Sequence, residues 1–271
     1  MVVLERFIMG WITGVTLLIT RVMPTLASHS GLQQGSAVLE IRGGGTSIRD
    51  DRPYSFSLTT FSPRGSLGQI EHALRSAQAG TLSAAVTYDG GIVVASVRRA
   101  ESSLVMDAGT RKISWVSDGV AMLYSGLAAD SRVLTEKAMD TAVGYRSKFG
   151  ENSAIPVGTL VSRIALTMQE YTQMGGVRPF GVALLVAGID LDGPLVYKLE
   201  PSGCYSAWKS VAIGKGSAEA EVMLHEGFKD SMSRENALEL VRRVLQRCSR
   251  GAGTEEIESA FIEDGGAGPI E

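Results

Sequence analysis

A short glycine-rich run, Gly214-Lys215-Gly216-Ser217, contains residue types that could bind a phosphate. At the start of a helix, such a run can cradle an anion with backbone N–H groups. It lacks the spacing of the Walker phosphate loop, however, and runs of this kind are more often plain turns from a strand into a helix. The run therefore predicts a turn and does not establish a phosphate site.

The histidines and cysteines show no pattern typical of a metal or disulfide centre. His29, His72 and His225 lack the mutual spacing of metal ligands, and His72 has no obvious base or ligand partner. Cys204 and Cys248 are too few for a disulfide framework and are typical of reduced thiols in an intracellular protein, with a single bridge left open. We therefore predict no metal and no cofactor.

Composition bounds the class of protein. The chain has 271 residues, of which 44% are hydrophobic and 20% charged, enough for a sizeable core in one or two domains. Its formal net charge of -3 gives no basic surface for nucleic acid, so no nucleic-acid partner is expected.

The N-terminal segment leaves two interpretations open. Residues 7–20 are free of charge, too short for a confident bilayer span but suited to a signal peptide, and Leu26-Ala27-Ser28 could serve as its cleavage site. The alternative is an unusual extension of an intracellular protein, with a flexible glycine-rich connector at 31–52. We predict an atypical extension at 1–53 and a folded domain at 54–271.

The domain is predicted to begin with a turn and an amphipathic helix. Pro63 and Gly65 supply turn chemistry, and Ser66 stands three residues before Gln69, the spacing of a capping box. We therefore expect a helix to start at Ser66 and to end at Gly80, a residue typical of the C′ position. Its apolar face contains Leu67, Ile70, Ala73, Leu74 and Ala77.

The spacing of apolar residues in the rest of the chain predicts strands that pair with their neighbours in sequence and helices that occur as consecutive pairs. Alternating or continuous apolar runs predict strands at 82–88, 92–97, 112–116, 120–126, 182–189, 195–199, 204–211 and 256–262. Helical patterns occupy 128–149, 153–171, 217–228 and 233–250. Two stacked antiparallel sheets with a helix layer outside each would bury all these faces. The predicted fold is α+β, a four-layer α-β-β-α sandwich.

Several blocks resemble proteasome core α-type subunits, and most closely the α2 type. Together they span roughly residues 54–264. They are Tyr54-x-Phe56 with Thr60-Phe61-Ser62-Pro63-x-Gly65 and Gln69-Ile70-Glu71-His72-Ala73, Tyr124-Ser125-Gly126-Leu127-Ala128-Ala129-Asp130-Ser131-Arg132, Gln169-Glu170-Tyr171-Thr172-Gln173 with Gly175-Gly176-Val177-Arg178-Pro179-Phe180-Gly181, and Ala207-Trp208-Lys209 with Ala212-Ile213-Gly214-Lys215-Gly216.

The resemblance implies the same sandwich, the Ntn-hydrolase fold, and a non-catalytic structural and gating role. Such subunits form the outer ring that controls substrate entry for ATP- and ubiquitin-dependent protein degradation. Implied partners are other α subunits, the β-ring subunits and proteasome activators or the regulatory particle. The implied location is the cytoplasm and nucleus, without membrane association.

Catalytic relatives in this family cut peptides with an N-terminal threonine, whose free amine is the base, helped by a lysine and an acidic residue. By resemblance, Thr81 and Lys112 match the threonine and the lysine, but Val97 occupies the acidic position. Thr81 also gains a free amine only if the chain is cleaved after Gly80. A processed threonine peptidase is therefore the alternative hypothesis, as is a divergent membrane-tethered relative.

Two sets of site residues follow from the resemblance. Tyr54, Pro63 and His72 match the cluster that fixes the N-terminal tail in open or closed states. Relatives that open cleanly often carry aspartate where this chain has Ser55, and tyrosine at the position of His72. A pH-sensitive contact of His72 is a further hypothesis.

The second set is a pocket for activators. By resemblance, Lys112 receives the C-terminal carboxylate of an activator protein, a contact that a lysine charge suits. Gly65, Leu67 and Gly80 match the other walls of this pocket.

Overall fold

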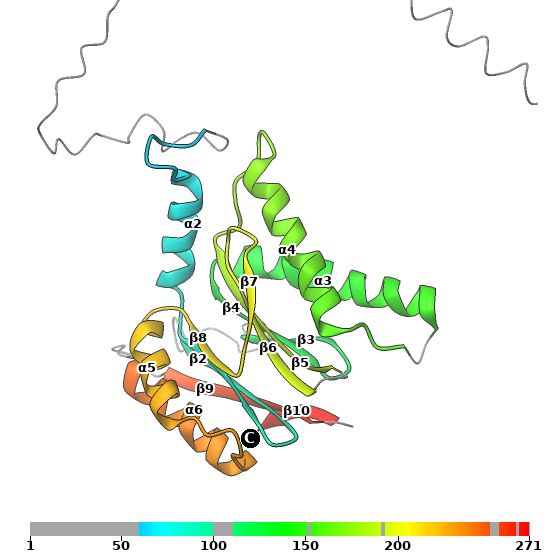
Figure 1. Ribbon diagram of the computed structural model, residues 1–271, viewed down its shortest axis with the longest axis vertical. Coiled ribbons are helices and arrows are strands. Elements are labelled where there is room, and N and C mark those ends of the chain that lie inside the picture. The colour runs from blue at the N-terminus through cyan, green and yellow to red at the C-terminus, as the bar shows by residue number, and fades with distance from the viewer. Residues whose placement is uncertain are drawn as a thin grey trace, which may run out of the picture. The chain divides into compact units, whose positions relative to one another are not determined.

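Two five-stranded sheets stack face to face in the computed structural model, which describes residues 60–99, 111–150, 153–190, 193–249, 255–263 and 266–270 (Figure 1). The first sheet has the order β10-β9-β2-β1-β8 and the second β3-β4-β5-β6-β7. Neighbouring strands in both sheets are antiparallel, which matches the expectation of locally paired strands. The predicted extension at 1–53 lies outside the described residues, as do Tyr54 and Ser55.

The strand bounds follow the predicted runs closely. The first sheet contains β1 (Ser83–Tyr88), β2 (Gly91–Arg99), β8 (Ser210–Ile213), β9 (Glu255–Glu263) and β10 (Gly266–Ile270). The second contains β3 (Ile113–Ser117), β4 (Val120–Gly126), β5 (Val182–Asp190), β6 (Gly193–Leu199) and β7 (Tyr205–Trp208).

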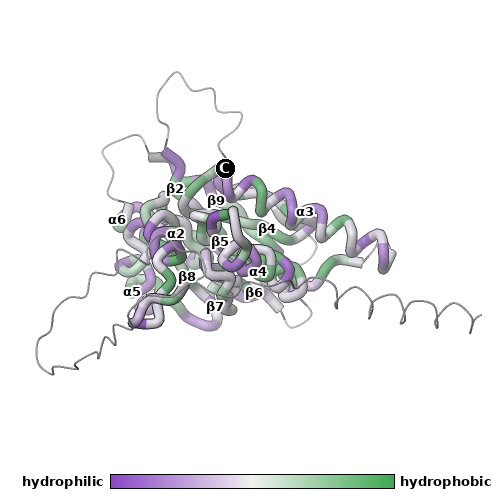
Figure 2. The backbone as a smooth tube through the Cα atoms, turned by 90° about the horizontal axis from the view of Figure 1, so that it is seen from above, coloured by the Kyte–Doolittle hydropathy of each residue, from purple (hydrophilic) through white to green (hydrophobic). Residues whose placement is uncertain are grey.

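Helices cover the outer face of each sheet. Helices α3 (Ala128–Phe149) and α4 (Val157–Gln173) pack on the second sheet, and α5 (Ser217–Gly227) and α6 (Arg234–Cys248) pack on the first (Figure 1). Figure 2 shows hydrophilic and hydrophobic residues alternating along α3, as expected for a helix with one face on a core. The four-layer α-β-β-α sandwich is confirmed.

The strand residues divide between three apolar clusters. In β5, Leu184 and Val186 pack toward α3 and α4, whereas Leu185 lies in the cluster between the two sheets. In β1, Ala84 packs toward α5 and α6, whereas Ala85 faces the other sheet. Because both faces are buried, these strands have nearly continuous apolar sequences.

One predicted strand, 204–211, is two strands in different sheets. β7 pairs with β6 in the second sheet, and β8 pairs with β1 in the first. Lys209 connects them, and its carbonyl accepts a hydrogen bond from Thr87 N at 2.8 Å. The two strands differ in burial, since every residue of β7 is exposed whereas Val211, Ala212 and Ile213 of β8 are buried. Strand β10 was not predicted, since its glycine-rich sequence has low strand propensity.

Helix α2 (Gly68–Ala79) begins two residues later than predicted, and the predicted capping box is wrong. Leu67 occupies the N-cap and makes no side-chain cap. The Ser66 hydroxyl instead lies 2.9 Å from the Ser62 hydroxyl, within a turn closed by Gly65 N donating to Ser62 O at 2.8 Å. The preceding turn therefore competes successfully for the serine side chain.

The expected C′ role of Gly80 is also wrong. Gly80 is the C-cap and has φ -68°, a conformation that any residue adopts. Glycine is needed there for space, because a Cβ atom would lie 2.1 Å from Gly126 N and 2.4 Å from Ser125 Oγ. The end of α2 therefore packs directly on the backbone at the end of β4.

A buried carboxylate joins two of the blocks that carried the resemblance. Asp130, in the first turn of α3, accepts hydrogen bonds from Arg178 Nη1 and Nη2 at 2.6 and 2.8 Å, and from Gly181 N at 2.9 Å. Leu127 N donates to Gly181 O at 3.1 Å. The start of α3 is thereby fixed to the segment that leads from α4 into β5.

Replacing Asp130 with asparagine should destabilise the fold by about 2 kcal/mol, because the charged acceptor of two guanidinium bonds is lost. The bonds from Arg178 hold the pKa of the Asp130 carboxyl below its usual range. This stabilisation is therefore complete above the unfolded-state pKa, about 3.9, and is lost as the pH falls through the lower folded-state pKa. Urea unfolding of both proteins between pH 3 and 7 measures the difference.

Asp118→Asn is the matched control, since Asp118 pairs with Arg146 but its side chain is 93% exposed. Its unfolding free energy should change by less than about 0.5 kcal/mol. Equal effects of the two substitutions would contradict the role assigned to Asp130.

Candidate functional site

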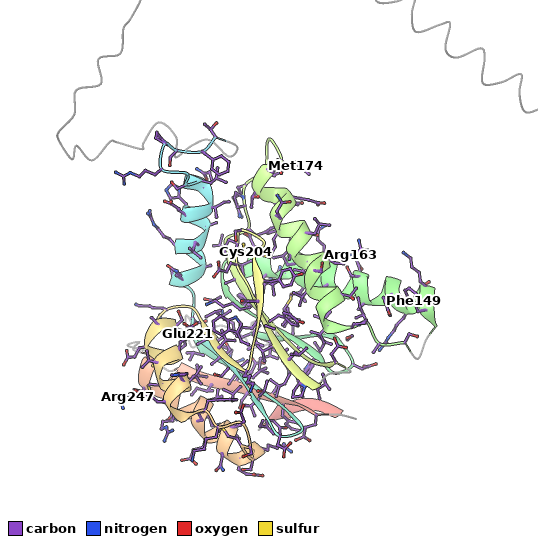
Figure 3. The ribbon with its side chains drawn as sticks, viewed as in Figure 1. Phe149, Arg163, Met174, Cys204, Glu221 and Arg247 are labelled. Atoms are coloured by element: carbon purple, nitrogen blue, oxygen red, sulfur yellow. The ribbon has the colours of Figure 1, made fainter. Side chains whose placement is uncertain are left out.

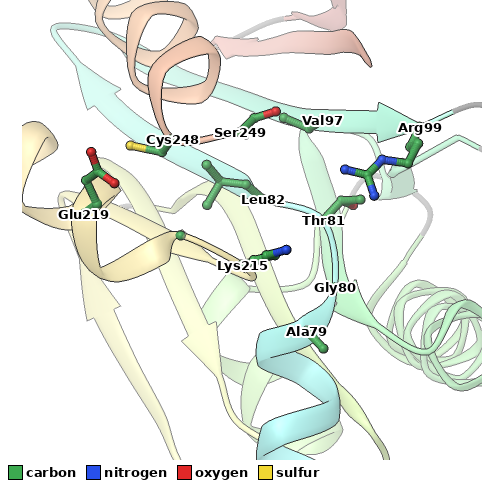
Figure 4. A pocket seen from close by; sticks show the side chains of 11 residues that line it. Ala79, Gly80, Thr81, Leu82, Val97, Arg99, Lys215, Glu219, Cys248 and Ser249 are labelled. Atoms are coloured by element: carbon green, nitrogen blue, oxygen red, sulfur yellow. The ribbon is translucent and has the colours of Figure 1, made fainter. Parts of the chain in front are cut away.

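A pocket of about 240 Å³ opens where α2 ends and β1 begins. The start of α5 and the end of α6 complete it, and Thr81 lines it together with Val97 (Figure 4). Two basic side chains, Arg99 and Lys215, extend toward Thr81 in this view. The pocket therefore surrounds the position that the resemblance matched to a catalytic threonine.

Thr81 lies two residues before β1, in the short link from α2, and lacks the surroundings of a nucleophile. Its hydroxyl oxygen is buried and finds no hydrogen-bond partner among the described residues. Lys112 does not line the pocket, and Val97 supplies no carboxylate. The peptide before Thr81 is held in place, since the Gly80 carbonyl accepts a hydrogen bond from Lys215 N at 2.9 Å. The threonine, lysine and acid of a peptidase are not assembled here.

The run that could have cradled a phosphate is a turn between β8 and α5, as predicted. Gly214 and Gly216 have φ values of 102° and 87°, in the left-handed region that favours glycine. A Cβ atom on Gly214 would also lie 2.5 Å from Thr81 O. The glycines therefore allow the turn to pack against the start of β1.

Lys112 lies just before β3 in a half-buried position. Its Nζ stands 3.9 Å from the centroid of the Tyr124 ring, in a cation-π contact. Its backbone N–H donates to Glu258 Oε2 at 2.9 Å. Burial lowers the pKa of the Lys112 amine to about 8, and the Glu258 charge opposes this shift.

Two of the four predicted pocket residues, Lys112 and Gly80, contact the same strand, β4. Lys112 lies against Tyr124 and Gly80 against the next two residues of β4. Gly65 and Leu67 precede the other end of α2, whose 12 residues span about 18 Å. A pocket formed by all four would therefore need a neighbouring chain.

The predicted gate residues are only partly placed. Tyr54 lies outside the described residues. Pro63 is exposed in the turn before α2, and His72 is exposed in the first half of that helix. Nothing in this geometry tests a gating role, which stays a prediction.

Sequence reasoning missed the partners of Lys112. Tyr124 and Glu258 come from β4 and β9, and Glu258 pairs in register with Ser96 of β2. The sequence does not single out Glu258, because β9 also contains Glu255, Glu256 and Glu263.

The two-sheet sandwich defines the Ntn-hydrolase fold. Among the described residues, no lysine and acid are arranged around Thr81 as in a peptidase, which places the chain among the non-catalytic members of that fold. Comparison with known proteins gives the family. Residues 77–262 match the family described as proteasome subunit. The chain is 42% identical over 218 residues to proteasome subunit alpha type-2-A of Arabidopsis thaliana, covering 80% of this chain and 90% of that protein.

Two further relatives have similar sequence identity to the chain. Proteasome subunit alpha type-2 of Saccharomyces cerevisiae is 41% identical over 214 residues, covering 78% of this chain and 85% of the relative. That of Dictyostelium discoideum is 44% identical over 189 residues, covering 70% and 80%. The chain therefore belongs to the proteasome subunit family, and the relatives are of the alpha type, the non-catalytic subunits of the proteasome core.

Proposed function

We propose that the chain is a structural and gating α subunit in the outer ring of the proteasome core particle. There it controls substrate entry for ATP- and ubiquitin-dependent degradation and docks activators, in the cytoplasm and nucleus. The observation that carries this proposal is the identity of about 42% to alpha type-2 subunits across most of the domain. The buried Thr81 hydroxyl, beside which the described residues place no lysine and carboxylate arranged as in a peptidase, supports the proposal, because a subunit of this kind needs no nucleophile.

Exposed apolar side chains support a role in assembly. Phe149 at the end of α3 is 63% exposed, and Val143 on the same helix is 66% exposed (Figure 3 shows Phe149 and Met174 at the helix ends). Phe61, before α2, is 63% exposed. Contiguous exposed apolar surface is typical of sites that contact other proteins, and Met139, 38% exposed, lies one turn before Val143 on α3. We assign the partners as neighbouring α subunits and the β ring.

No helix in the described ranges is both long and apolar enough to cross a membrane. The alternative of a membrane-tethered relative falls on residues 1–53, outside those ranges, and no observation favours it.

Val143→Glu should reduce incorporation of the chain into core particles several-fold, because a charge would be buried at the proposed contact. The unfolding free energy of the chain itself should change by less than about 0.5 kcal/mol, since the site is exposed. Native electrophoresis after co-expression with the other core subunits measures incorporation.

Lys137→Gln, at another exposed position of α3, is the control and should assemble normally. Full incorporation of Val143→Glu would show that this part of α3 does not contact other subunits. If the unmodified chain failed to enter particles at all, the proposed function would be wrong.

A further inference from the structure

The pocket at the end of α2 contains a polar group that the protein itself leaves unsatisfied. The Thr81 hydroxyl oxygen is buried and has no hydrogen-bond partner in the part of the chain that the structure describes. Leaving a buried hydroxyl without a partner is costly, and native structures rarely keep one. Because Thr81 lines the pocket, a ligand bound there could supply the missing partner.

Positive charge is concentrated at the same end of the pocket. Arg99 and Lys215 extend toward Thr81 from two sides, whereas Glu219 lies at the other end (Figure 4). Two cations against one carboxylate leave one net positive charge on the lining residues. Helix α5 adds to it, because its N-cap, Gly216, lines the pocket and has no side chain to cap the helix. The Thr81 end of the pocket therefore favours an anion.

Apolar side chains form the middle of the pocket. Leu82 and Val97 lie between its two ends in Figure 4, and both belong to the core cluster under α5 and α6, which fixes their positions. Ala79 also lines the pocket and is exposed at the end of α2. The volume, about 240 Å³, is below the range of about 300–1,000 Å³ that is typical for drug-sized ligands. The pocket therefore suits a small ligand with a short apolar part.

We propose that this pocket binds a free, short-chain aliphatic monocarboxylate of about four to six carbon atoms. The two cations attract the carboxylate, the Thr81 hydroxyl donates a hydrogen bond to one of its oxygens, and the alkyl chain lies along Leu82 and Val97. A dicarboxylate or a phosphate is disfavoured, because its further negative charge would meet the apolar wall or Glu219. The site lies within one chain, so ligand binding there does not depend on the proposed function.

The test titrates isovalerate into the full chain at neutral pH and measures the dissociation constant by ligand-observed NMR. Isovaleramide has nearly the same shape without the charge, and glutarate has the same number of carbons with a second charge. Both should bind at least about tenfold more weakly than isovalerate, since the first loses a charge-assisted contact and the second has a charge desolvated. Equal binding of isovalerate and isovaleramide would overturn the proposal.

A free acid and a peptide C-terminus share the carboxylate, so a further probe separates them. N-acetylleucine carries the isobutyl group of isovalerate together with an amide, and its added atoms should not fit the small pocket. It should therefore bind more weakly than isovalerate. Binding of N-acetylleucine alone would identify a peptide terminus as the ligand and would contradict the proposal.

Two substitutions test the polar end of the pocket. Thr81→Val keeps the shape but removes the hydroxyl, so the unliganded chain should be as stable or more stable while isovalerate binds several-fold more weakly. Lys215→Gln should weaken binding about tenfold, whereas Lys137→Gln on α3 should bind as the unmodified chain does. Unchanged binding by both pocket variants would overturn the proposal.

Ala79→Leu tests the location of the ligand. The larger side chain would extend into the pocket from the exposed end of α2 and should abolish detectable binding, while both residues have high helix propensity. Gln78→Leu, at the neighbouring exposed position that does not line the pocket, is the matched control and should bind normally. Thermal unfolding confirms that each variant is folded. Binding retained by Ala79→Leu would place the ligand elsewhere and disprove the site.

Discussion

Gly80→Ala is expected to destabilise the chain by about 3 kcal/mol or more, although alanine adds only one methyl group. The added Cβ would lie 2.1 Å from Gly126 N and 2.9 Å from Ser125 C, which are backbone atoms that cannot rotate away. Relief requires α2 to separate from the end of β4. Separation would also strain the hydrogen bond from Ser125 Oγ to Ala77 O, now 2.8 Å long.

Gly144→Ala is the matched control for this prediction. Gly144 lies within α3, and a Cβ atom there meets no atom within 4 Å. Alanine should therefore stabilise the chain by about 0.5–1 kcal/mol, because it has the higher helix propensity. Urea unfolding of the two variants gives both values. A loss below about 1 kcal/mol for Gly80→Ala would show that α2 adapts easily to the extra atom.

The sandwich was predictable because its strands are bounded by clear turns and buried on both faces. Asp89-Gly90 joins two apolar runs, and the structure pairs Tyr88 with Gly91 across that turn. The long helix after β4 has the predicted bounds. The spacing of apolar residues changes from that of a strand to that of a helix at Ala128, and a glycine follows Phe149. Local signals of this kind need no knowledge of distant residues.

Features that depend on distant packing were not predictable. The crossing at Lys209 reflects which sheet each half of the run joins, and no residue in the run marks it. Gly80 was predicted as a helix-ending glycine. The glycine is in fact needed because the backbone of β4, more than 40 residues later in the sequence, comes too close for a side chain. Lys112 was singled out by resemblance, but the tyrosine ring that its amine contacts and the glutamate whose charge acts on its pKa come from two other strands.

Lys112→Gln is expected to weaken activator docking by about 10- to 100-fold, the loss of one charge-assisted contact of about 1.5–3 kcal/mol. Ring assembly should be unchanged, because the substitution keeps a long polar side chain at a half-buried position. Affinity of an activator peptide with a free C-terminal carboxylate, titrated into assembled particles, measures the effect. Docking with unchanged affinity would disprove the assignment of Lys112.

The pH dependence of docking provides a second measurement on the same contact. The amine must be protonated to attract a carboxylate, and the pKa of Lys112 is lowered to about 8. Docking should therefore be constant below about pH 7 and weaken as the pH rises through 8, to about tenfold weaker near pH 9. An ordinary lysine would keep its charge, and the affinity, throughout this range. Lys112→Gln should abolish the pH dependence.

Lys215→Gln distinguishes this site from the neighbouring pocket at Thr81. Lys215 is exposed and extends toward Thr81, so it is the rival cation for an incoming carboxylate (Figure 4). If Lys112 receives the carboxylate, Lys215→Gln should leave both the affinity and its fall above pH 8 unchanged. If Lys215→Gln alone weakens docking, the peptide binds where catalytic relatives keep their nucleophile. The pair of variants therefore decides whether the activator carboxylate binds at Lys112 or in the pocket at Thr81.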